Sequence, residues 1–183
     1  SGSVIINSAY ACDVGGIVGI MEGKASLANA YNTGSINGEL EHSVTWVTDS
    51  TYGTGGIAGY AAELGAVRNA CNMGSVSGSS NVGGIIGYID GDGRNTGSGL
   101  YNTGSVTGEG YVGGIIGENV LGSIASVYNT GMVTCSGDSG AAGGIIGLNY
   151  KGSVTCAYNS GSVKGSGYYT GGVAGRNKGE TVQ

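Results

Sequence analysis

The sequence is poor in charge and lacks two residue types altogether. Of 183 residues, 7 are Lys or Arg and 12 are Asp or Glu, and proline and phenylalanine are absent. Missing proline excludes a collagen-like chain, and a net charge of only −5 with a mean hydropathy of +0.08 argues against disorder. Seven basic residues form no patch that would predict nucleic-acid binding. No apolar run approaches the roughly 18 residues of a membrane span.

Glycine, in contrast, is abundant, with 42 residues arranged in repeating motifs. The motif Gly-Gly-(Ile/Val)-apolar-Gly occurs six times at gaps of 40, 28, 30, 30 and 28 residues, and its first glycines are Gly15, Gly55, Gly83, Gly113, Gly143 and Gly171. The motif (Tyr/Cys)-Asn-x-Gly-(Ser/Met)-(Val/Ile) occurs five times, with its asparagines at Asn32, Asn72, Asn102, Asn129 and Asn159. Such periodicity predicts an array of stacked units. We interpret residues 1–183 as one repeat domain, a fragment of a longer array.

One copy is longer than the others. Between Ile36 and Gly55 lie 18 residues, where the next copy has 6 between Val76 and Gly83. Insertions within a repeat usually form loops on one face of the array. We therefore predict a loop over about residues 39–52.

Each copy contains three short apolar runs, seen in the fourth copy at residues 113–117, 123–128 and 131–134. The runs are rich in Val, Ile, Tyr and Thr and are bounded by Gly, Ser and Asn, which is typical of strands and turns. Three short strands in about 30 residues predict an all-β fold, a β-solenoid of about six coils. A β-propeller blade usually needs four strands and about 40 residues, so a propeller or a row of hairpins is the weaker alternative.

In a solenoid, equivalent residues of successive coils stack about 4.8 Å apart. We expect an aliphatic core column of Ile17, Ile57, Ile85, Ile115, Ile145 and Val173. We expect the five motif asparagines to stack as a hydrogen-bonded amide ladder. At the corner that follows, we expect asparagine and the glycine two residues later to adopt the left-handed backbone conformation.

The residues Gly-Gly-Ile-x-Gly followed by Tyr-Asn-x-Gly-Ser-Val resemble the GLUG repeat family over nearly the whole chain, apart from the insertion. Gly16-Ile17-Val18-Gly19 is similar to the motif that names this family, with Ile or Val where the family often has Leu. The family occurs in secreted and surface-anchored bacterial proteins, including adhesin-like proteins and immunoglobulin A peptidases. The resemblance implies an extracellular repeat region and brings no catalytic residue with it.

Candidate chemical sites are sparse. His42 is the single histidine and lies in the insertion, so we favour a solvated loop residue over a member of a catalytic triad. The cysteines Cys12, Cys71, Cys135 and Cys156 have no C-x-x-C spacing, which disfavours a zinc site and favours free thiols. The segment 90–93 reads Asp-Gly-Asp-Gly but lacks the later glutamate of a calcium loop. We predict no metal and no cofactor.

Tyrosine is frequent, with 12 residues. Tyr31, Tyr101, Tyr128 and Tyr158 share one column, and we expect a structural role for them. A second group lies at the corner before the Gly-Gly motif and is our candidate ligand strip: Tyr52, Tyr111, Tyr168 and Tyr169. Aromatic rings with a polar tip suit contact with sugars or proteins.

The leading functional hypothesis is a non-catalytic, extracellular structural or adhesive module of a larger bacterial surface or secreted protein. Its expected partners are a host protein or glycan and neighbouring domains or further repeats of the same chain. The alternative is a carbohydrate-binding or carbohydrate-active β-helix domain; glycoside hydrolysis would need two carboxyl groups about 5–9.5 Å apart, for which Glu22 and Glu63 are the nearest candidates. A threonine face for ice binding is the third hypothesis, interrupted by Met73 and Ser160.

Overall fold

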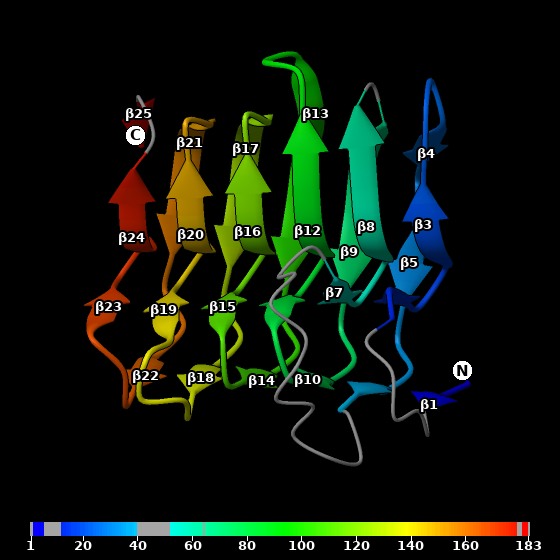
Figure 1. The fold of residues 1–183 in the computed structure, drawn as a ribbon. Helices are drawn as coiled ribbons and strands as arrows, with labels where there is room; N and C mark the ends of the chain where they lie inside the picture. Colours follow the sequence, from blue (N-terminus) through cyan, green and yellow to red (C-terminus); the bar gives the residue numbers. More distant parts are fainter. Residues whose placement is uncertain (1, 6–11, 40–51, 64, 179–180, 183) are drawn as a thin grey trace.

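The structure, a computed structural model, describes residues 2–5, 12–39, 52–63, 65–178 and 181–182. Most of the predicted insertion, including His42, lies outside the described residues. Within the described ranges the regular structure consists of β-strands, and no helix has the length and hydrophobicity needed to cross a membrane. The chain winds through successive coils that lie side by side (Figure 1). The prediction of an all-β solenoid is confirmed.

The solenoid has five complete coils, and β23 to β25 begin a sixth. All three predicted runs are present in each coil. The Gly-Gly run, however, is divided into two strands by a bend, so the strands hydrogen-bond into four parallel sheets, here called A to D in chain order from the asparagine corner.

Sheets A and B are built from short strands of two or three residues. Sheet A contains, in order, β1 (Val4–Ile5), β6 (Ile36–Gly38), β10 (Val76–Gly78), β14 (Val106–Gly108), β18 (Val133–Cys135) and β22 (Val163–Gly165). Sheet B contains β2 (Val14–Gly15), β7 (Gly53–Gly55), β11 (Asn81–Gly83), β15 (Tyr111–Gly113), β19 (Ala141–Gly143) and β23 (Tyr169–Gly171).

Sheets C and D have the longer strands. Sheet C contains β3 (Val18–Met21), β8 (Ala58–Glu63), β12 (Ile86–Gly91), β16 (Ile116–Val120), β20 (Ile146–Tyr150) and β24 (Ala174–Lys178). Sheet D contains β4 (Ser26–Ala28), β9 (Ala66–Asn72), β13 (Asn95–Asn102), β17 (Ser123–Asn129), β21 (Ser153–Asn159) and β25 (Thr181–Val182), and β5 (Tyr31–Asn32) also pairs with β9.

Equivalent residues of neighbouring coils lie in register, as the period predicts. The backbone N–H of Ile85 donates to the oxygen of Ile115, and that of Ile115 donates to the oxygen of Ile145, each at 2.9 Å. The four central members of this column have no exposed surface, whereas Ile17, in the first coil, is 50 % exposed. The column therefore belongs to the core wherever a coil covers it on both sides.

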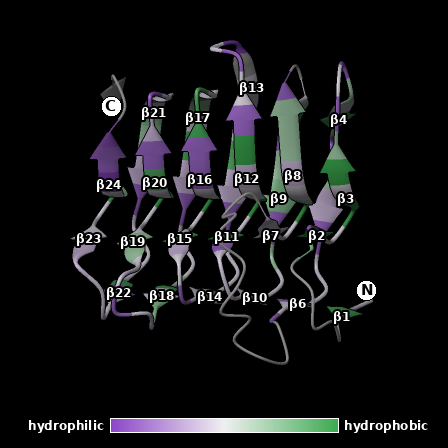
Figure 2. Cartoon of the chain, in the orientation of Figure 1, coloured by the Kyte–Doolittle hydropathy of each residue, from purple (hydrophilic) through white to green (hydrophobic). Residues whose placement is uncertain are grey.

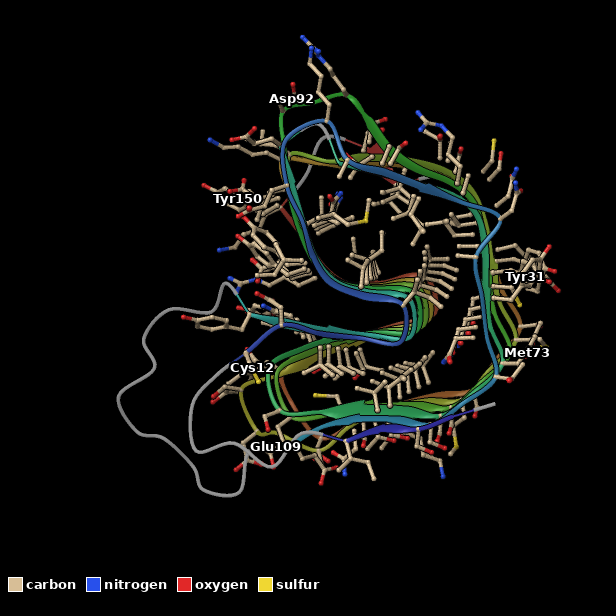
Figure 3. All side chains as sticks on the ribbon, turned by 90° about the vertical axis from the view of Figure 1, so that its right-hand side faces the viewer. Cys12, Tyr31, Met73, Asp92, Glu109 and Tyr150 are labelled. Carbon is tan, nitrogen blue, oxygen red and sulfur yellow. The ribbon has the colours of Figure 1, made fainter. Side chains whose placement is uncertain are left out.

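The interior is divided into two apolar compartments, because the bend between sheets B and C points inward (Figure 3). The larger compartment lies between sheets C and D and contains Ile86, Leu100 and Ile124. The smaller one lies between sheets A and B and is built mainly from valine, such as Val82, Val106 and Val112. Stacked branched aliphatic residues suit both, since cross-strand pairs of this kind stabilise parallel ladders.

The motif asparagines form a continuous ladder inside the solenoid. The side-chain nitrogen of Asn72 donates to Asn102 Oδ1 at 2.7 Å, and that of Asn102 donates to Asn129 Oδ1 at 2.8 Å. The same bond joins Asn32 to Asn72 and Asn129 to Asn159. Each amide nitrogen also donates to the backbone oxygen of the glycine two residues later. Buried amides are thereby satisfied, as buried polar groups must be.

The expected left-handed conformation occurs at a different position from the one predicted. The positive φ angles in sheet D belong to Asn29, Asn69, Gly99, Ser126 and Cys156, three residues before the ladder asparagines. The glycine two residues after each ladder asparagine does not have a positive φ angle. Glycine is needed there for another reason: a Cβ on Gly74 or Gly104 would overlap the carbonyl oxygen of the equivalent glycine in the preceding coil.

A second asparagine ladder, which was not predicted from the sequence, runs through the last coils at the end of sheet C. Asn119 donates to Asn149 Oδ1 at 3.0 Å, and Asn149 donates to Asn177 Oδ1 at 2.9 Å. The same column holds Ala61 and Ile89 in earlier coils. Figure 2 shows this change as a sheet C that is greener in β8 and more purple in β16, β20 and β24. The recurring Asn-x-x-Gly of Asn119 and Asn149 was the available signal.

Candidate functional site

The most regular surface feature is a column of tyrosines on the outer side of sheet D. Tyr31, Cys71, Tyr101, Tyr128 and Tyr158 are aligned by strand register across five coils. The rings of Tyr101 and Tyr128 stack with centroids 5.0 Å apart and planes 7° apart. Tyr31, Tyr128 and Tyr158 are 61 %, 42 % and 63 % exposed. These tyrosines therefore form a surface, which the expectation of a structural role did not anticipate.

The alternation of strands explains this orientation. Successive side chains of a strand point to opposite faces. Each ladder asparagine points inward, so the residue before it must point outward. Figure 3 shows Tyr31 and Met73 on the outer right-hand side, away from both compartments. We call Tyr31, Tyr101, Tyr128 and Tyr158 the tyrosine column.

On the side of the asparagine corner, the positions beside the tyrosine column are uncharged and partly apolar. Met73 is 48 % exposed and Met132 is 43 % exposed. The remaining positions equivalent to these carry small hydroxyl residues, namely Thr33, Thr103, Thr130, Ser160, Ser35, Ser75, Ser105 and Ser162. A polar but uncharged face with exposed rings is chemically suited to a glycan or a protein surface.

Cys71 interrupts the column, and a neighbouring ring covers it. Cys71 has no exposed surface. Hydrogen bonding to Cys71 raises the pKa of Tyr101 to about 12, and burial raises the pKa of the Cys71 thiol. Both groups are therefore neutral at physiological pH.

The predicted ligand strip is only partly brought together. Tyr111 and Tyr169 share a column of sheet B, separated by Ala141. Tyr168 and Tyr169 meet edge to face with centroids 6.3 Å apart, and the guanidinium of Arg176 lies 4.7 Å from the Tyr169 ring centroid. Tyr52 lies two coils before Tyr111, and its backbone oxygen accepts a 3.0 Å bond from Asn81. The strip is thus a scattered set rather than a continuous surface.

A buried carboxyl group lies on sheet C. Glu118, on β16, is aligned between Tyr88 of β12 and Leu148 of β20, and only 8 % of it is exposed. Its Oε2 atom has no hydrogen-bond partner among the described residues. Burial raises the pKa of Glu118 to about 7. Sequence reasoning missed this residue, because its column holds Tyr60 and Tyr88 in other coils and no acid recurs.

The other candidate groups show no assembled site. All four cysteines are free: Cys71 and Cys135 are buried, Cys12 is intermediate and Cys156 is exposed. In the turn at 90–93, Asp92 pairs with Arg94 at 3.2 Å and accepts a bond from the Arg94 backbone N–H. Among the residues that the structure describes, no group of three or more His, Cys, Asp or Glu side chains could hold a metal ion.

Comparison of the chain with family models, with curated proteins and with solved structures gave no match.

Proposed function

We propose that this chain is a non-catalytic structural and adhesive repeat module of a larger bacterial protein, either secreted or held at the cell surface, and that its tyrosine column binds glycan. The similarity of its motifs to GLUG repeats supports the bacterial and extracellular assignment. The observation that supports glycan binding is the exposed, in-register tyrosine column on sheet D.

The structural part of the proposal rests on how the coils are joined. Each coil hydrogen-bonds to the next through all four sheets, and most of its core is completed by its neighbours. Five complete coils at about 4.8 Å make a rigid section of roughly 24 Å. In the first coil Ile17 and Ile20 are about half exposed, so an additional coil or a neighbouring domain of the same protein would bury them.

The adhesive part rests on the chemistry of the tyrosine column. The rings of Tyr101 and Tyr128 are stacked on each other, so binding through this pair costs little side-chain entropy. The column is uncharged and flanked by hydroxyl groups, which can hydrogen-bond to sugar hydroxyls while the rings provide apolar contact. Tyrosine is also the residue type that interfaces use for this combination of contacts.

A glycan array probed with the full chain tests the proposal. The parent chain should bind a defined subset of neutral glycans, and the double variant Tyr101→Ser/Tyr128→Ser should bind them at least about tenfold more weakly. Tyr150→Ser is the matched control, since Tyr150 is 39 % exposed but lies on sheet C. Circular dichroism of each variant checks that the coils persist. Equal binding by the double variant and the control would contradict a role for the column.

The non-catalytic part has its own test. The parent chain, incubated with a panel of polysaccharides, should release no reducing ends. Release that disappears in a Glu63→Gln or Glu22→Gln variant would instead support the carbohydrate-active alternative, since hydrolysis requires paired carboxyl groups.

A further inference from the structure

A groove of about 450 Å³ crosses the turns between sheets C and D in the first three coils. Its floor is Gly65 and Ala66, which are buried. Lys24 and Ser26 of the first coil form one side, and Arg94 and Thr96 of the third coil form the other; Glu63 and Arg68 belong to the coil between them. Such a volume is within the range of small-ligand sites.

The groove exists because successive turns differ in length. In the second coil, β8 ends at Glu63 and β9 begins at Ala66, so the turn is short. In the third coil, β12 ends at Gly91 and β13 begins at Asn95, and Figure 1 shows this turn rising above its neighbours. The longer turn carries Asp92 and Arg94 at its top (Figure 3 labels Asp92).

Basic charge is concentrated in this groove. The whole chain has 7 Lys and Arg residues and a net charge of −5, yet three of the basic residues line this one depression. Glu63 is the single acid of the lining, so the lining has a net charge of 3 − 1 = +2. Arg94 pairs with Asp92 at 3.2 Å, but that pair is solvent-exposed and weak. Within the described part of the chain, Lys24 and Arg68 make no ion pair.

We infer that this groove binds the acidic groups, carboxylate or sulfate, of an acidic polysaccharide. Arg and Lys side chains bind oxyanions through charge-assisted hydrogen bonds, and the guanidinium of Arg68 can do so in bidentate fashion. The long side chains stand over a floor of small residues, so an anionic group can approach between them.

The polymeric nature of the ligand follows from the position of the groove on sheet D. Thr96 lines the groove, and Tyr101 of the tyrosine column lies five residues further along the same strand. At up to about 3.4 Å per residue, the Cα atoms of Thr96 and Tyr101 are at most about 17 Å apart. An extended ligand can therefore contact both, with its acidic groups in the groove and its rings on the column. Only the contact between the ligand and the tyrosine column rests on the proposed function. Binding of the acidic groups in the groove does not depend on it.

The inference is tested by titrating the full chain with polygalacturonate (carboxylate), heparin (sulfate) and the neutral polymer dextran in a calorimeter. The charge-removed variant is Lys24→Gln/Arg68→Gln, and the matched control is Lys151→Gln/Lys164→Gln, which removes the same charge elsewhere. The parent should bind at least one acidic polymer. The groove variant should bind that polymer at least about tenfold more weakly, whereas the control should stay within about twofold.

The two acidic polymers separate carboxylate from sulfate recognition. Equal weakening in both double variants would mean that only net charge matters, and failure of the parent to bind either acidic polymer would also overturn the inference. Failure of the proposed function gives a different result. In that case Tyr101→Ser/Tyr128→Ser would bind neutral glycans as the parent does, while the groove variant would still bind the acidic polymer more weakly than the parent.

Discussion

Gly84 lies directly against Asn102, at the point where the bend between sheets B and C touches the asparagine ladder. A Cβ placed on Gly84 would be 2.6 Å from Asn102 Cγ. The same relation joins Gly56 to Asn72 at 2.6 Å. The two sequence motifs are therefore one packing unit: the bend of the Gly-Gly motif fits against the amide of the Asn-x-Gly motif, which explains why they recur together.

This contact predicts that a methyl group added at Gly84 destabilises the fold. Gly84→Ala should lower the free energy of unfolding by about 3 kcal/mol, because the added carbon meets the ladder amide and a backbone oxygen, and neither can move freely. Urea denaturation measures the change. Gly172→Ala is the matched control, since Gly172 occupies the same motif position in the last coil and has open space around it. Similar losses in both variants would contradict the packing argument.

A negative charge in the asparagine ladder should destabilise the fold at least as much as the methyl group at Gly84. Asn102→Asp removes the donor to Gly104 and to Asn129 and places a carboxylate where no surface is exposed. We expect a loss of about 3 kcal/mol or more at pH 7. The loss should shrink at low pH, where the aspartate is protonated and can donate again. Urea midpoints at pH 4 and pH 7 measure this.

The control for the ladder is Asn69→Asp, at an exposed position on the neighbouring strand β9. Asn69 has a φ of 51° and makes one 3.4 Å bond to Asn29. Aspartate tolerates this conformation nearly as well as asparagine does. An equal effect of the two substitutions would show that burial in the ladder is not the cause.

The sequence predicted the features that depend on the period alone. Coils stacked in register place residues 27 to 30 positions apart in contact, so the columns of Ile85 and Asn102 follow directly from the repeat. The bend at Gly84 did not follow, because a run of Gly-Gly-Ile-Ile-Gly resembles one short strand. It becomes visible only when the inward packing against the ladder is known.

The surface features were harder to predict because they depend on differences between coils. The groove at Gly65 arises from unequal turns in three successive copies, and Glu118 is buried in a column where other coils carry tyrosine. The tyrosine column was located correctly, but its outward orientation required the strand alternation set by the inward asparagines. The repeat therefore predicts the stacked coils and their core columns, whereas the candidate sites arise where one coil differs from its neighbours.

The four thiols should differ strongly in reactivity. Cys156 is exposed and should react with an aromatic disulfide reagent in the folded chain, and Cys12 should react more slowly. Cys71 and Cys135 should stay protected until unfolding, because they are buried and burial raises the pKa of both thiols, which lowers the thiolate fraction. Counting released chromophore with and without urea measures this. A Cys156→Ser variant should lose the fast phase only; four equally fast thiols would contradict the fold.

Glu118 should make the stability of the chain fall as pH rises. The carboxyl of the unfolded chain titrates near pH 4.5, while burial raises the pKa in the folded chain to about 7. Below pH 4.5 both states are protonated and the residue costs nothing. Between pH 4.5 and 7 the unfolded state ionises first, so stability is lost, and above pH 7 the penalty stays constant. Glu118→Gln should therefore raise the free energy of unfolding by on the order of 1–3 kcal/mol at pH 8 and by almost nothing at pH 4.

Urea denaturation midpoints of the parent and of Glu118→Gln, measured between pH 4 and pH 8, test this prediction, and Glu109→Gln is the control at an exposed position. A pH-independent gain would instead indicate that the amide simply packs better than the acid.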